Sequence, residues 1–195
     1  RGVKLAHGLG VDDMYTTNLD YVFNEDTNQS KVFSWEGKGL AKYRRIIDSA
    51  KNLASEQNLS FRTYPLEPEE EKPVCDLNPN EMVFITSDGH VTPCTYLGRF
   101  QNPRYFKDEK LVLPLKSFGN INKEDFWKIW NSQPYQAFKK PFTERSRAYE
   151  RLLTTMLNHE PSLIRIKEAE KQYYQSLKNN PVPAECKTCP KMYGI

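Results

Sequence analysis

The sequence predicts an α+β fold, in which a β/α unit precedes a small β-hairpin domain with a helical insertion. Three observations predict this class. The first is that residues 1–66 contain β-prone runs on either side of a segment whose apolar residues recur with helical spacing. The second is a sequence typical of a tight hairpin at residues 83–92. The third is a helical pattern of apolar residues over residues 122–180. The chain has 195 residues, 38% of them hydrophobic, which is enough to bury a core.

Residues 1–66 are predicted to form a β-α-β unit. After an initial helix end, the expected strand, loop, helix and strand cover residues 13–23, 24–39, 40–54 and 59–66. The helix is predicted from apolar residues that recur on one face between Leu40 and Ala54. A strand, a helix and a second strand in this order imply a right-handed crossover between parallel strands.

A short charged linker follows at Glu67–Lys72 and is typical of a solvated hinge between two modules. Pro65 and Pro68 end the strand that precedes it. We therefore expect a domain boundary near residue 70, with one domain at 1–70 and another at 71–195.

The second domain is predicted to contain a β-hairpin. Val83–Thr86 and His90–Thr92 are β-prone runs. Ser87-Asp88-Gly89 between them is a sequence typical of a tight turn, in which the glycine readily adopts a positive φ. A second hairpin is expected around residues 107–110, within a long stretch without clear periodicity.

Helices are expected in an insertion at about residues 122–180. Asn122 is predicted to cap a helix that begins at Lys123, Thr143 to cap a second helix, and Pro161 to begin a third. The second and third are expected to pair as an antiparallel hairpin joined at residues 158–161. The side chains expected to face inward are Phe126, Trp127, Ile129 and Trp130, then Tyr149, Leu152, Leu153, Met156 and Leu157, and finally Leu163, Ile166, Ala169, Tyr173 and Leu177.

The four cysteines are the main functional signal. Cys186 and Cys189 form a C-x2-C pair, which can present two sulfurs to one centre from a single turn. The predicted hairpin folds the chain back, so Cys75 before it and Cys94 after it can end close together. Because thiolates are soft ligands that select zinc or iron–sulfur clusters, the two pairs predict a four-thiolate metal site.

Two alternatives stay open at this point. Four cysteines also allow two disulfides, which are rare in reducing compartments, or ordinary buried thiols that pack as small hydrophobic side chains. The spacing alone does not distinguish a zinc site from an iron–sulfur cluster, since zinc sites built from four cysteines use similar pairs.

The order C-x13-G-x4-C, a long gap and C-x2-C resembles the auxiliary-cluster region of radical S-adenosylmethionine enzymes. The residues that match it are Cys75, Gly89, Cys94, Cys186 and Cys189. Ser87–Cys94 is similar to that family's hairpin, and Phe118–Ile121 followed by Phe126–Trp130 is similar to its G-N-I … I-W segment. The region is called SPASM when it holds two clusters and twitch when it holds one.

The resemblance implies a fold, a cofactor and a role. Residues 1–70 would be the end of the family's partial β/α barrel, and residues 71–195 the SPASM/twitch-like domain. Cys75, Cys94, Cys186 and Cys189 would ligate one auxiliary [4Fe–4S] cluster. Its expected role is electron transfer, which full cysteine ligation favours, or the positioning of a peptide, protein or small-molecule substrate. The alternative function is a zinc-stabilised binding module without a redox role.

Departures from the family pattern limit what carries over. No cysteine follows Cys189, so one cluster is expected rather than two. Thr95 stands where some family members have an acidic catalytic base, so that role is not assigned. The C-x3-C-x2-C motif of the S-adenosylmethionine cluster is absent, so this chain is not expected to start radical chemistry by itself.

The start at Arg1, in the middle of a pattern, leads us to expect a fragment of a longer protein. Its partner would be an upstream radical S-adenosylmethionine barrel of the same polypeptide. Enzyme activity, S-adenosylmethionine and a second cluster are then expected only in that parent protein.

Charge and hydropathy limit other partners. Before residue 99 there are 10 Lys and Arg against 15 Asp and Glu, and from residue 99 onward there are 18 against 10. The basic half carries no recognised nucleic-acid-binding motif, so nucleic acid is not an expected partner. No apolar run reaches membrane-spanning length and no signal peptide is found, so we expect a cytoplasmic protein without membrane contact.

Overall fold

The computed structural model describes residues 1–19, 22–99, 103–107, 109–158 and 162–195. It mixes helices with small sheets, which confirms the α+β class, and no sheet in the described ranges closes into a barrel. The chain divides into two compact units. Unit 1 comprises Arg1–Glu70, Pro103–Leu111 and Tyr193–Ile195, and unit 2 comprises Glu71–Asn102 and Val112–Met192.

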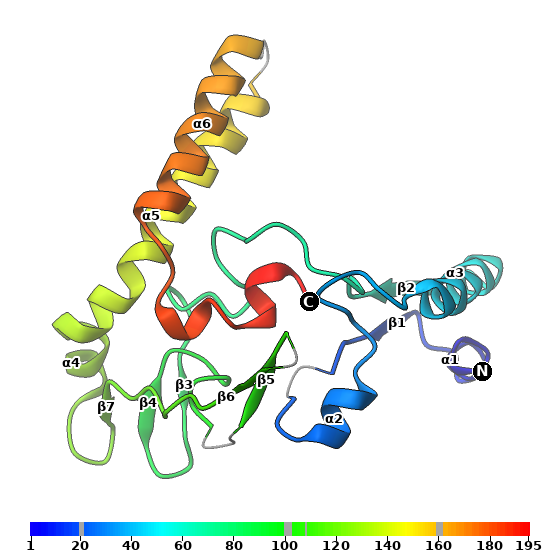
Figure 1. Cartoon of the computed structure of the whole chain (residues 1–195), viewed down its shortest axis with the longest axis horizontal. Coiled ribbons are helices and arrows are strands. Elements are labelled where there is room, and N and C mark those ends of the chain that lie inside the picture. The colour runs from blue at the N-terminus through cyan, green and yellow to red at the C-terminus, as the bar shows by residue number, and fades with distance from the viewer. Residues whose placement is uncertain (20–21, 100–102, 108, 159–161) are drawn as a thin grey trace. The chain divides into compact units, whose positions relative to one another are not determined.

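Unit 1 contains the predicted β-α-β arrangement. Helix α1 (Gly2–Gly8) is followed by strand β1 (Asp13–Thr16), helix α3 (Ala41–Glu56) and strand β2 (Ser60–Thr63), as Figure 1 shows. The two strands pair in parallel, with Asp13 opposite Ser60, which confirms the expected parallel pairing. A small core of Val3, Ala54 and Leu59 joins α1 to α3 and β2. Both strands are shorter than the β-prone runs that predicted them.

The predicted loop at 24–39 was wrong in part, because it contains helix α2 (Glu25–Ser30). Its start is stabilised by a capping box: the Asn24 side chain accepts from the Thr27 backbone N–H, and the Thr27 hydroxyl accepts from the Asn24 N–H. The helix buries no residue, so the sequence shows no helical spacing of apolar residues that would have predicted it. Its stability comes from the cap and from acidic side chains in the first turn.

The second predicted hairpin is confirmed as an antiparallel pair within unit 1. It consists of β5 (Arg104–Phe106) and β6 (Glu109–Leu111). The Phe106 ring meets the Trp35 ring edge-on at a centroid distance of 4.6 Å, and the Trp35 ring also contacts Tyr193 at 5.6 Å. These aromatic contacts attach the hairpin and the last residues of the chain to the rest of unit 1.

Unit 2 is built on a three-stranded antiparallel sheet in the order β3-β4-β7. Strands β3 (Phe84–Ile85) and β4 (His90–Thr92) form the predicted hairpin, and β7 (Gly119–Asn120), which the sequence did not predict, pairs with β4. The central strand contributes Val91, which is buried with Ile129 and Tyr135 in the core of this unit.

Helix α4 (Phe126–Trp130) begins later than expected. Asp125, not Asn122, is its N-cap: the Asp125 side chain accepts hydrogen bonds from the backbone N–H groups of Trp127 and Lys128. Asn122 instead bonds to the β3–β4 turn. Within the helix Ile129 is fully buried, but Trp127 is 64% exposed, so the prediction that it faces inward was wrong.

Helix α5 is continuous from Gln133 to Met156, so the prediction that Thr143 caps a new helix was wrong. Pro134 lies in its first turn, as expected of a helix start. Pro141 lies inside it, and the helix continues although proline has no N–H to donate. The Thr143 hydroxyl donates to Asn80 Oδ1 at 3.0 Å, so the residue attaches the helix to a preceding loop.

Helices α5 and α6 (Leu163–Asn179) form the predicted antiparallel hairpin, which projects from the sheet in Figure 1. Ala148, Leu152 and Tyr173 form its core, with Ala169 and Leu177 packed against them. Several side chains predicted to face inward are nevertheless exposed, namely Tyr149, Leu153, Met156, Leu157 and Leu163, so the prediction was wrong for them. Pro161, expected to begin the third helix, lies outside the described residues; α6 begins after Ser162.

The tail of the chain forms two 3₁₀ helices, η1 (Ala184–Cys186) and η2 (Pro190–Tyr193). Within unit 2 the Lys72 N–H donates to the Met192 carbonyl at 2.8 Å, which places the tail beside the start of the Cys75 loop. None of the helices in the described ranges combines the length and apolar character that a membrane span needs.

We predict that Gly89→Ala destabilises unit 2 by about 2–3 kcal/mol. Gly89 has a φ of +89°, and a Cβ there would lie 2.5 Å from Asn122 Nδ2 and 2.7 Å from Asn120 Oδ1. Urea unfolding followed by tryptophan fluorescence and circular dichroism measures the loss. Gly10→Ala is the control: its φ is +70° but nothing lies within 4 Å, so only a backbone cost of about 1 kcal/mol is expected. Equal losses in the two variants would contradict the role of the crowded turn.

Candidate metal centre

Cys94 is fixed by the end of the β3–β4 hairpin. The Thr92 hydroxyl lies 2.9 Å from the Phe84 carbonyl and 3.3 Å from the Cys94 carbonyl, and the Gly98 N–H donates to the same Cys94 carbonyl at 2.9 Å. Gly98 is required for this turn, because a Cβ would lie 2.5 Å from both the Phe84 ring and Thr92 Oγ1. Cys94 therefore lies on a turn that these hydrogen bonds hold in place after the hairpin.

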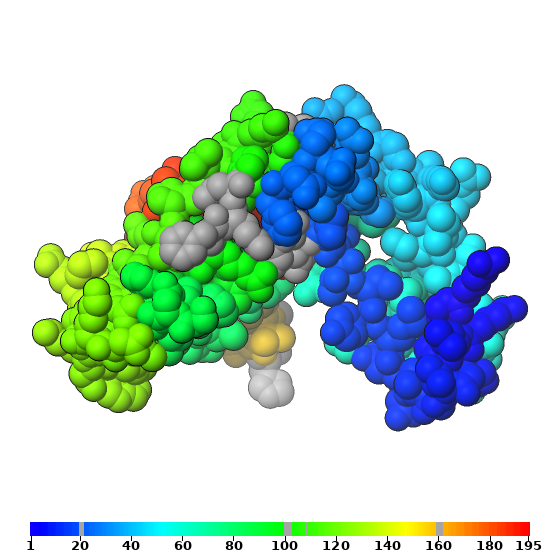
Figure 2. Space-filling view, turned by 90° about the horizontal axis from the view of Figure 1, so that it is seen from below, coloured from blue at the N-terminus to red at the C-terminus, as the bar shows by residue number. Residues whose placement is uncertain are grey.

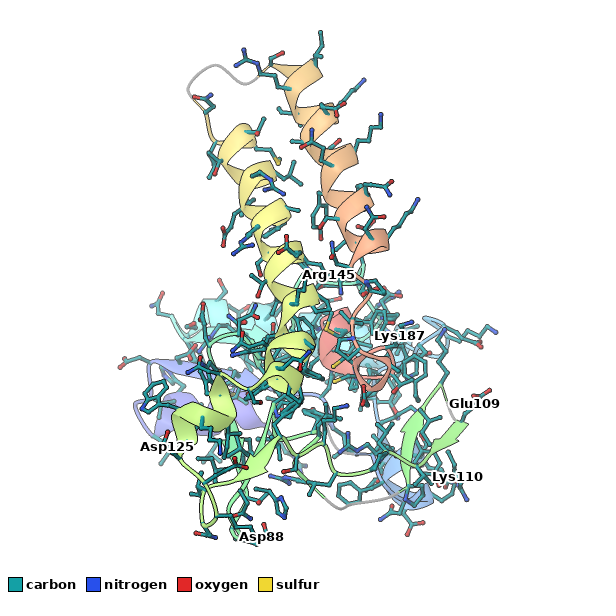
Figure 3. All side chains as sticks on the ribbon, turned by 90° about the vertical axis from the view of Figure 1, so that its left-hand side faces the viewer. Asp88, Glu109, Lys110, Asp125, Arg145 and Lys187 are labelled. Atoms are coloured by element: carbon teal, nitrogen blue, oxygen red, sulfur yellow. The ribbon has the colours of Figure 1, made fainter. Side chains whose placement is uncertain are left out.

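Cys75 lies on a loop that two side-chain contacts hold against α5. Arg145 donates to Glu71 Oε1 at 2.6 Å on one side of Cys75, and Thr143 donates to Asn80 on the other. The Arg145 side chain is fully buried, and Figure 3 shows it where the helical hairpin meets the rest of the unit. Burial raises the pKa of the Cys75 thiol, and hydrogen bonds from the backbone N–H groups of Leu77 and Asn78 oppose that rise.

Cys186 and Cys189 lie on one turn of the tail, as their spacing predicts. The Cys186 N–H donates to the Pro183 carbonyl, and the Cys189 N–H donates to the Cys186 carbonyl at 3.1 Å. Lys187, labelled in Figure 3, lies between them on the same turn. An ion pair of 2.9 Å between Glu185 and Lys116 attaches the turn to the segment that leads into β7.

The structure brings the four thiols into one neighbourhood. Burial raises the pKa of the Cys186 thiol, and the thiols of Cys189, Cys94 and Cys75 each raise it further. A neighbouring group shifts a pKa in this way when the two groups lie close together. All four cysteines belong to the described residues, and no disulfide joins them. The alternative of two disulfides is therefore not supported.

Their spacing does not match a single metal ion. Across the described parts of the chain, no three His, Cys, Asp or Glu side chains come close enough together to hold one ion. A tetrahedral zinc site requires sulfurs about 2.3 Å from one centre, hence about 4 Å from one another. The described residues therefore show no preformed tetrahedral site for a single ion.

Two buried hydroxyl groups near these thiols have no hydrogen-bond partner among the described residues. One is the Thr188 hydroxyl, between Cys186 and Cys189, and the other is the Tyr135 hydroxyl on α5. Buried polar groups are normally bonded, so such exceptions point to a ligand that would bond them. Sequence reasoning missed Tyr135; the signal was its place on the buried stripe of α5, together with Phe138, Phe142 and Arg145.

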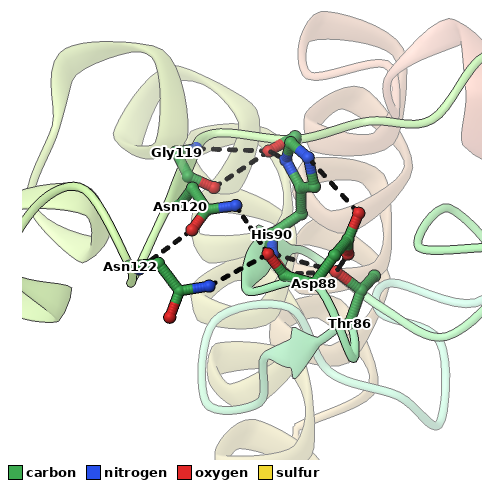
Figure 4. Close-up of polar contacts among 7 residues, drawn as sticks. Thr86, Asp88, His90, Gly119, Asn120 and Asn122 are labelled. Atoms are coloured by element: carbon green, nitrogen blue, oxygen red, sulfur yellow. Dashed lines mark hydrogen bonds and ion pairs between the residues drawn. The ribbon is translucent and has the colours of Figure 1, made fainter.

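His90 does not belong to this centre. Its Nδ1 is joined to Ser117 Oγ at 2.9 Å, and Ser117 in turn donates to the Gly119 carbonyl (Figure 4). The Asn120 and Asn122 side chains both donate to the Asp88 carbonyl in the turn. This network holds β7 onto the hairpin, so His90 is a structural residue of the sheet, as expected of a polar residue beside a turn.

Comparison with known proteins identifies the sheet and its helices. The model of the SPASM iron–sulfur cluster-binding domain matches residues 75–155, which run from Cys75 through the hairpin to the end of α5. Residues 75–155 thus resemble a SPASM domain. The resemblance predicted from the hairpin and the G-N-I … I-W segment is thereby confirmed. Cys75 and Cys94 lie within the matched part of the SPASM domain, and Cys186 and Cys189 lie beyond it.

One characterised protein is similar over a longer stretch. The tungsten-containing aldehyde ferredoxin oxidoreductase cofactor-modifying protein of Pyrococcus furiosus is 29% identical over 131 residues. The alignment covers 67% of this chain and 35% of that protein, so the chain spans about a third of its relative's length. No solved structure matches the chain.

We predict that Glu71→Gln destabilises unit 2 more than Arg145→Met does. The first change leaves a fully buried guanidinium without its carboxylate, at a cost of about 3 kcal/mol. The second leaves Glu71, which is 39% exposed and can be hydrated, so the loss is smaller, about 1 kcal/mol. Urea unfolding measures both, and the double variant should resemble Arg145→Met. A larger loss in Arg145→Met would contradict this account of the Cys75 loop.

Proposed function

We propose that this chain is the carboxyl-terminal part of a radical S-adenosylmethionine enzyme and binds one auxiliary [4Fe–4S] cluster through Cys75, Cys94, Cys186 and Cys189. The observation that carries the proposal is the convergence of these four thiols from three separate segments of a SPASM-containing chain. The SPASM family binds iron–sulfur clusters, which makes a cluster the first choice for four such thiols.

The donor set fits a cluster better than a zinc ion. Thiolates suit both, but one zinc ion would need at least three ligands closer together than any in the described ranges. A cube of four iron and four sulfide is larger and takes one thiolate at each iron, so its ligands lie further apart. Burial raises the pKa of the Cys75 and Cys186 thiols, and a metal bound at these sulfurs would displace their protons outright.

Electron transfer is the role that this ligand set favours. A bound [4Fe–4S] cluster supplies one-electron redox chemistry, with a potential set by charge, burial and hydrogen bonds to sulfur. Four cysteines occupy the ligand positions of all four irons, so no iron is left open to bind substrate. The residues of this chain would then hold the cluster, shield it from water and donate hydrogen bonds to its sulfurs.

Unit 1 supports the assignment of an upstream barrel as its partner. A parallel sheet is normally buried on both faces, yet β1 and β2 form a sheet of only two four-residue strands. A groove of about 710 Å³ lies beside them, lined mainly by apolar side chains including Met14, Ile46 and Phe61. Figure 2 shows α1 and α3, in dark blue and cyan, on the face next to this groove. We propose that further β/α units of the parent enzyme cover this surface, as in a partial barrel.

We also propose a substrate class and a cellular compartment for the parent enzyme. The relative's name describes modification of a cofactor, which favours a cofactor-like small molecule over a peptide or protein. A cytoplasmic location is proposed because cluster thiols must stay reduced, and disulfides are rare in that compartment. A C-x3-C-x2-C motif upstream in the parent sequence is the expected sign of the enzyme class, and its absence would contradict it.

Anaerobic reconstitution of the full chain with iron and sulfide tests the cluster. We expect brown protein with a broad visible absorption band and about four iron and about four sulfide per chain. Cys94→Ala and Cys186→Ala should each weaken metal retention by at least about tenfold, since each removes a ligand. Ser87→Ala, an exposed change in the hairpin turn, is the control and should retain the metal.

Stoichiometric zinc in colourless protein, with no iron retained after reconstitution, would overturn the cluster and favour the zinc-stabilised binding module. Unchanged iron and sulfide in Cys94→Ala would overturn the four-cysteine ligand set while leaving a cluster in place. The two results are distinguished by metal analysis of the same samples.

A further inference from the structure

We propose that the Tyr135 hydroxyl donates a hydrogen bond to the Cys94 sulfur, or to a cluster sulfide next to it, and thereby raises the reduction potential of the auxiliary cluster. The inference rests on the proposed function, because it concerns the same four-cysteine centre. It assigns to α5 a direct electronic effect on that centre.

The Tyr135 ring is held rigidly in the first turn of α5. It is fully buried and stacks on Phe118 with a centroid distance of 4.3 Å and an interplanar angle of 5°. The Trp130 ring meets it edge-on at 5.2 Å, and Val91 of the central strand and Ile129 share its buried cluster. A ring confined on three sides cannot turn away, so the direction of its hydroxyl is set by packing.

The hydroxyl at the end of this ring has no hydrogen-bond partner among the described residues. A buried hydroxyl that bonds to nothing is destabilising, and proteins keep such groups mainly where a ligand, water or ion completes them. A tyrosine hydroxyl carries an O–H donor as well as an acceptor oxygen, so a neighbouring sulfur acceptor would satisfy its donor.

Cys94 provides that acceptor. The ring lies in one buried cluster with Val91 of strand β4, and Cys94 follows three residues after Val91, just beyond the end of that strand. Burial raises the pKa of Tyr135, and the Cys94 thiol raises it further, as expected of two groups that lie close together. A thiolate or sulfide at this point would accept the hydrogen bond that the hydroxyl lacks.

Lys139 strengthens the hydroxyl as a donor. Its ammonium lies 3.6 Å from the centroid of the Trp130 ring and 4.7 Å from that of Tyr135, and the side chain is almost fully buried. A cation over the face of a phenol draws electron density from the ring, which makes the O–H more polar.

A hydrogen bond to sulfur is stronger when the cluster carries more negative charge. It therefore stabilises the reduced form more than the oxidised form, and the potential rises. Removing the donor should shift the potential to a more negative value without removing a ligand.

The test is Tyr135→Phe in the full chain, reconstituted anaerobically and titrated with reductant while electron paramagnetic resonance reports the reduced cluster. At the midpoint of the native protein, we expect the ratio of reduced to oxidised cluster to fall about fivefold in the variant. In the native protein the iron–sulfur stretching bands should shift on transfer to D2O through the tyrosine O–D group. In Tyr135→Phe that part of the shift should be lost. Tyr149→Phe, the same change on an exposed tyrosine of α5, is the matched control and should leave both readouts unchanged.

The outcomes separate this inference from the proposed function. A loaded cluster whose potential and D2O shift are the same in native protein and Tyr135→Phe would overturn the hydrogen bond. If Tyr135→Phe loads less iron, the potential is measured on the loaded fraction, and an unchanged value there overturns it equally. Failure of the native chain to take up iron and sulfide would overturn the proposed function itself.

Discussion

The constraint on which the rest of unit 2 depends is the meeting of four thiols that the sequence separates by more than a hundred residues. Cys94 is delivered by a hairpin, Cys75 by a loop fastened to α5, and the last two by one turn of the tail. Burial raises the pKa of the Cys75 and Cys186 thiols, and at Cys186 the other three thiols raise it further, so these groups stay protonated unless a metal binds them. The sheet, the Arg145–Glu71 pair and the tail contacts hold the segments that carry the four thiols in place.

Local chemistry explains which features the sequence predicts. Asp88-Gly89 forces a reversal, and so the β3–β4 hairpin and its flanking cysteines were predictable. The apolar period of residues 40–54 likewise predicted α3. Elements without a local signature were missed. Strand β7 has only two residues, and α2 buries none, so its Asn24 cap was its main sign.

Other errors came from tertiary contacts overriding good local rules. Thr143 has the chemistry of a helix cap, but Asn80 accepts its hydroxyl and the helix runs on through it. Asn122 precedes a helical pattern, yet its amide bonds to the hairpin turn and leaves Asp125 to cap α4. Tyr135 could not be assigned from the sequence, because its importance lies in where packing directs its hydroxyl, and the ligand roles of the cysteines remain a proposal.

The unbroken course of α5 restricts how the hairpin can change during evolution. A helix turns about 100° per residue, so one inserted residue would rotate everything beyond it out of phase with Tyr135, Phe138 and Phe142 at its base. Insertions or deletions of three, four or seven residues would keep the register, provided α6 changes by a similar length. We therefore expect related chains to differ in hairpin length by near-whole turns, while the aromatic base stays constant.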